Sequence, residues 1–220
     1  MKKRILITGG SRGIGRCISN LLREDKSLEV VAPPRQELNL TDKCSIEAFF
    51  KVQPPFNGLV KAAGINILGE IASIDDSHIT QMLDTNLVAP LKLIQRVVDG
   101  MKMNKGGKIV NISSIWGVRS KEKRTLYSMT KFGVEGLTRA LARELGPFNI
   151  LINSIAPGYV LTEMTYQNIP ADERERLCAE IPLRRMADPS EIAHLVKFLL
   201  SDENTYMTGQ NIIIDGGFLA

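Results

Sequence analysis

The sequence predicts an α/β fold, a doubly wound parallel sheet of the Rossmann type with helices on both faces. Short runs of β-branched and other apolar residues alternate with helix-length segments, and a glycine-rich turn directly follows the first run. Strands that alternate with helices form parallel sheets, because each helix crosses over the sheet before the next strand begins. The predicted strands are Arg4–Thr8 and the segments LEVVA, NGLVKAA, GGKIVNIS, FNILINSIA and QNIIID.

Start and stop signals place the longer helices between these strands. They run from the glycine-rich turn to about Arg23, over roughly Asp76–Met103, from about Leu126 to Leu145 with a stop at Gly146-Pro147, and onward from Asp188-Pro189.

Length and composition indicate one domain over residues 1–220. The chain has 220 residues, of which 44% are hydrophobic, enough for a single substantial core. No run approaches the roughly 18 apolar residues of a membrane span, and the first residues are too polar for a signal peptide. The net charge of +4 is spread among interleaved acids, so charge alone does not imply nucleic-acid binding. We therefore expect neither membrane nor nucleic acid as a partner.

Cysteine and histidine usage indicates a reducing, cytoplasmic setting. Cys17, Cys44 and Cys178 are an odd set without C-x-x-C spacing, and His78 and His194 form no ligand cluster with them. We expect no disulfide and no metal.

The turn Thr8–Gly15, with the sequence TGGSRGIG, follows a strand and opens a helix. Glycines in this context let backbone amides approach a pyrophosphate at the positive end of the helix. A P-loop is disfavoured, because Arg16 and Cys17 stand where lysine and a hydroxyl residue are needed. Taken alone, the turn is also compatible with mere tight packing.

The residue about 20 positions after the glycine-rich turn decides between the two nicotinamide dinucleotides. Arg35 stands there, and no carboxylate is present to accept a ribose 2′-hydroxyl. The guanidinium groups of Arg12 and Arg35 suit a 2′-phosphate instead. We expect NADP(H) in preference to NAD(H). The alternative is that Arg35 is a solvated surface residue and Glu37 reaches the ribose.

Four polar residues later in the chain are candidates for chemistry. Tyr127 and Lys131 are four residues apart and share a helical face, so the lysine charge favours proton release by the phenol. Ser114 closes a buried strand, where ligands of open α/β sheets bind, and the adjacent Ser113 points the opposite way. Asn86 costs helix propensity in mid-helix, which indicates either a functional role or a local backbone hydrogen bond.

Together these motifs resemble the short-chain dehydrogenase/reductase family, from Ile5 to Gly217. The resemblance implies a catalytic tetrad of Asn86, Ser114, Tyr127 and Lys131. In it Tyr127 donates a proton, Ser114 hydrogen-bonds the carbonyl oxygen, Lys131 binds the nicotinamide ribose and Asn86 holds a water. Besides Asn86, Tyr127 and Lys131, the cofactor contacts that it implies are Gly9, Ser11, Arg12, Gly13, Ile14, Gly15, Arg35, Asn39, Leu40, Ala62, Ala63, Gly64, Pro157, Gly158, Val160 and Thr162.

The chain departs from the family pattern at two places. The segment VVAPPRQELNLTD leads almost directly into the next helix, where the family has a helix and a third strand, so the region after the second strand is shortened. Lys61 stands where the family has an asparagine. We expect its ammonium to reach solvent along the flexible stem in preference to facing the cofactor phosphates.

The motifs NISSIWG, YSMTKFGVEGLTRALARELG, PGYVLTEM and IDGG look most like the 3-oxoacyl-acyl-carrier-protein reductases. The resemblance implies reduction of a small or carrier-bound ketone to a secondary alcohol, with residues 163–185 as a substrate lid. The alternatives are a sugar-nucleotide or keto-sugar reductase and a non-catalytic NADP-sensing protein. An anionic substrate would be attracted by the cations Arg119, Lys121, Lys123 and Arg124, unless these belong to a solvated loop.

The predicted helix around Tyr127 also indicates assembly. It carries more apolar positions than one core-facing stripe requires, which predicts a second buried face and a homodimer or homotetramer. These positions are Phe132, Val134, Leu137, Leu141 and Leu145.

Overall fold

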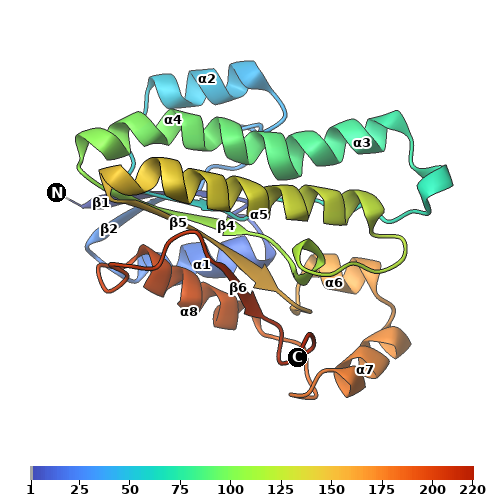
Figure 1. Ribbon diagram of the computed structural model, residues 1–220. Helices are drawn as coiled ribbons and strands as arrows, with labels where there is room; N and C mark the ends of the chain where they lie inside the picture. The colour runs from blue at the N-terminus through green and yellow to red at the C-terminus, as the bar shows by residue number, and fades with distance from the viewer. Residues whose placement is uncertain (1) are drawn as a thin grey trace.

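The computed structural model describes residues 2–220 and confirms the α/β fold class (Figure 1). One six-stranded, all-parallel sheet has the order β2-β1-β3-β4-β5-β6. The chain order reverses between β1 and β3, which is the switch point where open α/β sheets bind ligands. The strands are β1 (Lys3–Thr8), β2 (Leu28–Val31), β3 (Gly58–Lys61), β4 (Gly107–Ile112), β5 (Ile150–Pro157) and β6 (Asn211–Ile214).

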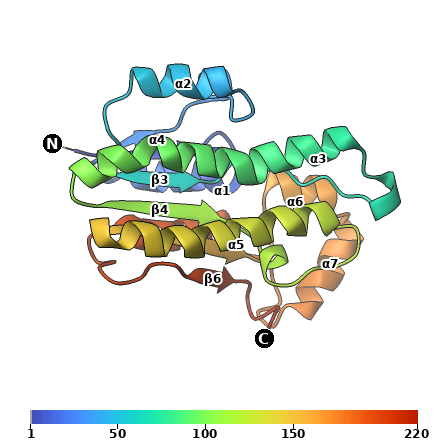
Figure 2. The ribbon, with the colours of Figure 1, turned by 45° about the horizontal axis from the view of Figure 1, so that its top comes forward.

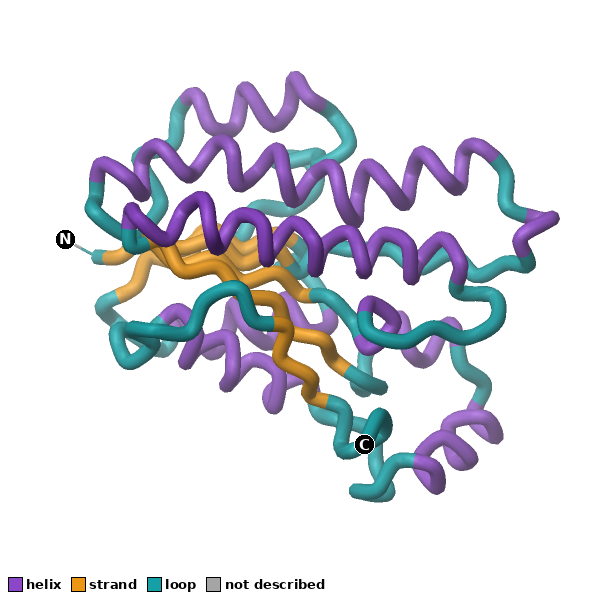
Figure 3. Tube along the Cα trace, viewed as in Figure 1, coloured by secondary structure: helices purple, strands orange, loops and turns teal. Residues whose placement is uncertain are grey.

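Helices cover both faces of the sheet, as Figures 2 and 3 show. Helices α1 and α8 lie on one face, while α2, α4 and α5 lie on the other. The helices are α1 (Gly13–Arg23), α2 (Lys43–Lys51), α3 (Asp76–Leu83), α4 (Ala89–Met103), α5 (Thr125–Leu145), α6 (Glu163–Asn168), α7 (Ala171–Glu180) and α8 (Pro189–Leu200). Within residues 2–220, no helix combines the length and the apolar character that crossing a bilayer requires.

Each layer of helices packs on the sheet through its own apolar cluster. On the α1/α8 face, Ile18, Leu22 and Val196 pack against strand residues that include Ile7 and Val60. On the opposite face, residues of α2, α4 and the end of α5 pack against Leu6, Leu59, Ile109 and Ile152. Burial of these side chains, each worth about 1.5–3 kcal/mol, holds the layers together.

The shortened region after β2 contains neither helix nor strand between Ala32 and Asp42. The Asp42 side chain accepts a hydrogen bond from the Cys44 backbone N–H at 2.8 Å and so caps α2 at once. With the third strand absent, β2 becomes an edge of the sheet.

The helix predicted over Asp76–Met103 is interrupted at its centre. A π-helical turn over Asp84–Val88 separates α3 from α4, although the three pieces continue in one direction (Figure 1). Pro90 explains the interruption, because it has no N–H for the carbonyl four residues earlier, that of Asn86.

Helix α5 presents fewer apolar residues outward than its sequence indicates. Val134 and Leu145 are buried, and Leu137 and Leu141 are partly buried against the α2–α4 cluster. Of the five positions, Phe132 alone is exposed, at 48%. Four of the five positions thus pack against the core, and Phe132 is the one of the five that is available to the expected second buried face.

Candidate active site

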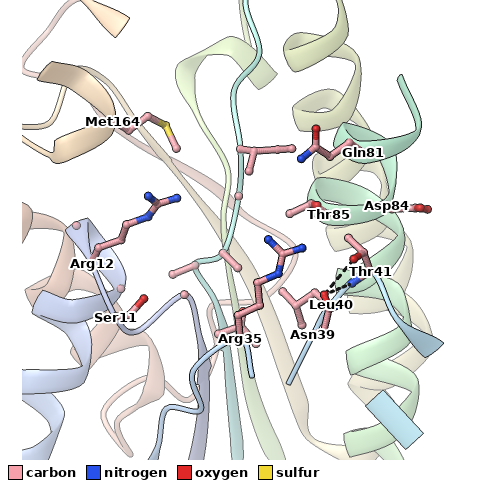
Figure 4. Close-up of a pocket in the computed structure, with 18 of the residues that line it drawn as sticks. Ser11, Arg12, Arg35, Asn39, Leu40, Thr41, Gln81, Asp84, Thr85 and Met164 are labelled. Carbon is pink, nitrogen blue, oxygen red and sulfur yellow. Dashed lines mark hydrogen bonds between the residues drawn. The ribbon is translucent and has the colours of Figure 1, made fainter. Parts of the chain in front are cut away.

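A pocket of about 750 Å³ opens at the carboxyl ends of β1 and β3 (Figure 4). Its walls are the glycine-rich turn, the strand ends, the shortened segment, one side of α3 and the start of α6. This volume and this position at the switch point fit a small-molecule or dinucleotide site.

The glycine-rich turn brings backbone close to backbone at one end of the pocket. Gly9 has φ +74°, and a Cβ there would lie 2.6 Å from the Ala63 nitrogen. A Cβ on Gly15 would lie 2.1 Å from the Gly9 carbonyl oxygen, so any side chain at either position would displace the chain.

The N-terminus of α1 is open to an anion. Its N-cap residue, Arg12, makes no side-chain capping bond, and the first turn holds no acidic residue. The first N–H groups of a helix have no partner within it and attract negative charge. The turn therefore fits the diphosphate of a dinucleotide.

Arg12 and Arg35 reach the same pocket from two segments, Arg12 from the start of α1 and Arg35 from the loop after β2 (Figure 4). Within residues 2–220 neither guanidinium makes an ion pair or a hydrogen bond to a side chain or carbonyl. Glu37, the alternative ribose ligand, does not line the pocket. Two cations with free donors match a phosphate better than a hydroxyl.

The segment after Arg35 is held in shape by its own side chains. Asn39 Oδ1 accepts hydrogen bonds from the Thr41 backbone N–H at 3.3 Å and from the Thr41 hydroxyl at 3.0 Å. Asn39, Leu40 and Thr41 thereby line the pocket in place of the absent helix and strand (Figure 4).

The pocket lining agrees with much of the expected cofactor set and adds to it. Of that set, Gly9, Ser11, Arg12, Gly13, Ile14, Gly15, Arg35, Asn39, Leu40, Ala62, Ala63, Gly64 and Thr162 line it, whereas Asn86, Tyr127, Lys131, Pro157, Gly158 and Val160 do not. The lining residues absent from the expected set are Thr8, Pro33, Leu38, Thr41, Ile65, Asp76, Ser77, Thr80, Gln81, Asp84, Thr85, Glu163 and Met164.

Asn86 joins the pocket wall to α5. Its Oδ1 accepts from the Ile65 backbone N–H at 2.9 Å, and its Nδ2 donates to the Ile65 carbonyl at 2.8 Å and to Thr130 Oγ1 at 3.2 Å. These partners are distant in the chain, so the alternative of a local backbone hydrogen bond does not hold. Asn86 thus links the loop after β3 to helix α5 by hydrogen bonds.

Tyr127 and Lys131 share one face of α5, as their spacing predicts. Lys131 Nζ lies 5.3 Å from the centroid of the Tyr127 ring and donates to the Ile112 carbonyl at 3.0 Å. A Cβ placed on Gly64, in the pocket wall, would lie 3.9 Å from Lys131 Nζ. The buried ammonium therefore stands beside both the phenol and the pocket.

Ser114 lies directly after β4, where its Oγ accepts from the Trp116 N–H at 3.2 Å. Ser113 Oγ is buried without a hydrogen-bond partner. The short turn Ile115–Gly117 packs against α5, so the end of β4 and the Tyr127 helix adjoin.

Lys61 corrects the sequence-based expectation. Its side chain is fully buried, and its Nζ donates to the Asn86 carbonyl at 2.8 Å, so the prediction that it reaches solvent is wrong. Strand β3 is central and covered on both faces, which leaves the four-carbon stem no route outward. Burial, reinforced by the charge of Lys131, lowers the pKa of Lys61 well below its ordinary value.

A buried carboxyl lies one turn beyond Lys131 on α5. Glu135 Oε2 accepts from Ser154 Oγ at 2.5 Å, whereas Oε1 has no partner. Burial raises the pKa of Glu135, and the Ser154 hydroxyl and the charges of Arg139 and Lys131 oppose that rise.

An aromatic cluster adjoins the lid segment. Trp116, Tyr159 and Phe218 meet edge to face, with ring centroids 5.3–6.5 Å apart. Residues of the lid, including Ile169 and Leu177, pack on this cluster together with Tyr127. Burial raises the pKa of Tyr159 to about 12, so that phenol stays protonated at neutral pH. The predicted lid thus forms helices α6 and α7 and covers the side of the site that contains Tyr127.

Within residues 2–220, no three His, Cys, Asp or Glu side chains are grouped to hold a metal ion. Cys17, Cys44 and Cys178 are free thiols.

Comparison with known proteins bears on this geometry directly. A family model described as enoyl-(acyl carrier protein) reductase matches residues 11–219. The chain belongs to the short-chain dehydrogenase/reductase family. It is 32% identical to a 3-oxoacyl-acyl-carrier-protein reductase of Vibrio cholerae, with 98% of this chain and 96% of that protein covered. The human protein of the same description is 34% identical, with 99% and 98% covered.

A solved structure gives the same result at the level of the fold. A short-chain dehydrogenase family protein from Francisella tularensis superposes with a TM-score of 0.91 at 30% identity, covering 100% of this chain and 99% of its own. The protein is thus an oxidoreductase of this family that resembles the 3-oxoacyl-acyl-carrier-protein reductases.

Proposed function

We propose that the protein is an NADP(H)-dependent reductase that converts a ketone into a secondary alcohol, with Asn86, Ser114, Tyr127 and Lys131 as its catalytic tetrad. The observation that carries the proposal is the Tyr127–Lys131 pair, with its buried ammonium 5.3 Å from the phenol ring and next to the pocket wall. A carbonyl held between this end of the pocket and α5 would receive its proton from the phenol.

Each residue of the tetrad has a distinct task. The nicotinamide, when bound, supplies the hydride for the carbonyl carbon. Tyr127 donates a proton to the carbonyl oxygen, and the Ser114 hydroxyl donates a hydrogen bond to the same oxygen as negative charge develops there. Lys131 holds its ammonium beside the phenol, where it favours proton transfer. Asn86 fixes the pocket wall at Ile65.

NADP(H) is the proposed cofactor because Arg12 and Arg35 offer free guanidinium groups to the pocket and no carboxylate stands at Arg35's position. Binding of NADPH and NADH is compared by fluorescence titration in the parent and in Arg35→Asp. NADPH should bind at least tenfold more tightly to the parent, and the substitution should reduce or reverse that preference. Equal affinities in the parent would contradict the assignment.

A carrier-bound 3-oxoacyl thioester is the first substrate to test, because several relatives are named as reductases of that class. NADPH oxidation would be followed by absorbance with 3-oxoacyl thioesters, neutral ketones and keto-sugar nucleotides in parallel. Turnover of the thioester above the others supports this substrate class. Turnover of keto-sugars alone would favour the sugar reductase alternative, and no turnover of any ketone would favour a cofactor-sensing protein.

The cations between Ser114 and Tyr127 bear on substrate charge. Lys121 faces Glu173 at 3.9 Å and Lys123 faces Glu70 at 3.6 Å, so both are partly neutralised. Arg124 is only 7% exposed, and its guanidinium carbon lies 6.0 Å from the centroid of the Trp116 ring. An anionic group of the substrate would therefore be attracted chiefly by Arg124 and the exposed Arg119.

The test compares an anionic ketone with a neutral analogue across ionic strength, in the parent and with Arg119 and Arg124 replaced by Gln. The anionic substrate should lose kcat/KM with salt and with the replacements, because screening weakens steering. Equal salt dependence for both substrates would remove the electrostatic role.

A further inference from the structure

The Asn86 carbonyl has an unusual position in the backbone. In an α-helix it would accept from the N–H of residue 90, but Pro90 has no N–H. The turn Asp84–Val88 widens to a π-helix here, and the next bond runs from the Ala89 N–H to the Asp84 carbonyl. A buried carbonyl left in this way requires a donor from outside the helix.

Lys61 provides that donor. Its Nζ lies 2.8 Å from the Asn86 carbonyl oxygen, and both residues are fully buried. Among residues 2–220, this is the one hydrogen bond that the amine makes, and no carboxylate lies within ion-pair distance of it. The partner of a buried amine is thus a single backbone oxygen in the turn that carries Asn86.

We propose that Lys61 is a positioning residue. Its amine replaces the backbone N–H that is missing at Pro90 and thereby keeps the Asn86 side chain against Ile65 in the pocket wall. The Asn86 side chain in turn fixes both backbone groups of Ile65, a pocket residue, and contacts Thr130 on the Tyr127 helix. Lys61 acts through Asn86 and does not itself line the pocket. It therefore links the centre of the sheet to both the cofactor wall and the catalytic helix.

Lys61 lies at the carboxyl end of β3. Residue 61 is in register with Thr8 on β1 and Asn111 on β4, so it ends the strand beneath the π-helical turn. The charged group that acts on it is Lys131, on α5. Since its hydrogen-bond partner is a backbone oxygen and the neighbouring charge is another cation, the role of Lys61 is geometric.

The experiment is a double-mutant cycle with Lys61→Met and Pro90→Ala. Lys61→Met leaves the Asn86 carbonyl buried without a donor, and kcat/KM should fall about tenfold or more. Pro90→Ala restores a backbone N–H for that carbonyl, so the double variant should recover to within about threefold of the parent. Lys108→Met is the matched control, because Lys108 also donates to a backbone carbonyl from a strand but lies at the opposite end of the sheet, and its kcat/KM should stay within about twofold.

Three kinetic results would overturn the proposal. The first two are a loss of kcat/KM below twofold in Lys61→Met and no recovery of kcat/KM on adding Pro90→Ala. The third is a pH profile of kcat/KM in the recovered double variant that is displaced from that of the parent, which would show that the charge of Lys61 acts in the reaction. If Lys61→Met does not fold, Lys61→Gln is compared with and without Pro90→Ala under the same criteria.

The inference rests on the proposed function only through turnover. Dinucleotide affinity, measured by fluorescence with NADPH and NADH, is a second measure of whether Ile65 in the pocket wall is correctly placed. It should weaken in Lys61→Met and recover in the double variant even if no ketone is reduced, whereas absence of turnover in the parent would contradict the proposed function alone. Affinity unchanged by Lys61→Met would count against the proposal.

Discussion

The two faces of the sheet differ in how they end. On the α1/α8 face, β1, β3 and β4 remain apolar almost to their carboxyl ends, with Ile7, Val60 and Ile112 in one cluster. On the α5 face, apolar residues give way to Thr8, Lys61 and Asn111 in the same strands, and all three are buried. The same three strands thus support a dry core on one side and a polar layer on the other.

Buried polar groups are costly unless they are hydrogen-bonded, and the polar layer is only partly satisfied. Asn111 Nδ2 donates to Thr138 Oγ1 at 3.0 Å, but Asn111 Oδ1, Ser113 Oγ and Thr8 Oγ1 have no partner among residues 2–220. One face of this molecule thus favours stability, while the other accepts a loss of stability beneath the helix that carries Tyr127.

Tyr127→Phe should have the largest effect and should act on turnover alone. The ring and its packing remain while the proton donor is lost, so kcat should fall ~10²–10⁴-fold with NADPH binding retained. Steady-state kinetics and a cofactor titration measure the two effects. Tyr206, which is 96% exposed, provides the control, and Tyr206→Phe should leave kcat unchanged. Activity of Tyr127→Phe within a few-fold of the parent would remove this residue from the mechanism.

Leu22→Ala tests the apolar face of the sheet and should lower stability without lowering turnover. Leu22 is 1% exposed on α1, and its truncation should lower the free energy of unfolding by about 2–5 kcal/mol. Turnover at a temperature where the variant is folded should equal that of the parent. Urea titration and kinetics are compared. A large loss of kcat in the folded variant would show that the two faces are not functionally separate.

Glu135→Gln tests the polar layer through pH. Because burial raises the pKa of Glu135, the folded state binds a proton more readily than the unfolded chain between the ordinary carboxyl value and the raised one. The free energy of unfolding of the parent therefore falls as pH rises through that window, relative to Glu135→Gln. Melting temperatures across mildly acidic pH measure the difference. Glu144→Gln, an exposed position on the same helix, should follow the parent, and parallel curves for the parent and Glu135→Gln would contradict the assignment.

The outer surfaces of the two helical layers should differ in whether they bind another copy of the chain. Phe132 and Met129 on α5 are 48% and 50% exposed, and we expect them at the contact of a homodimer or homotetramer. Light scattering should give a multiple of the 24.3 kDa chain mass for the parent and a smaller particle for Phe132→Ser. Phe198→Ser, on the other layer at 36% exposure, should leave the mass unchanged. A parent particle of one chain mass at micromolar concentration would defeat this prediction.

Features set by neighbouring residues in the chain were predictable from the sequence. The glycine-rich turn, the shared face of Tyr127 and Lys131, and the strand end at Ser114 each depend on short-range spacing, and the structure has all three. The break in the helix over Asp76–Met103 also had a signal, since Pro90 removes a backbone donor in mid-helix.

Features that depend on which segments meet were not predictable in this way. Periodicity places Lys61 on a strand but does not reveal that its stem ends beneath the Asn86 turn. The side of α3 with Ser77, Thr80 and Gln81 lines the pocket only because that helix crosses the end of the sheet. The number of apolar residues on α5 likewise did not reveal how much of that helix is covered by the apolar cluster that it shares with α2, α4 and the sheet.

The loss of one strand after β2 creates a free row of backbone donors and acceptors, and such a row is a template for intermolecular pairing and aggregation. Three features limit that hazard here. Strand β2 is only 4 residues long, and it carries Glu29, whose carboxylate pairs with Arg4 at 2.9 Å. Pro33 and Pro34 follow at once and have no N–H to extend a ladder. The short, charged and proline-flanked β2 can therefore keep this edge of the sheet free of self-association.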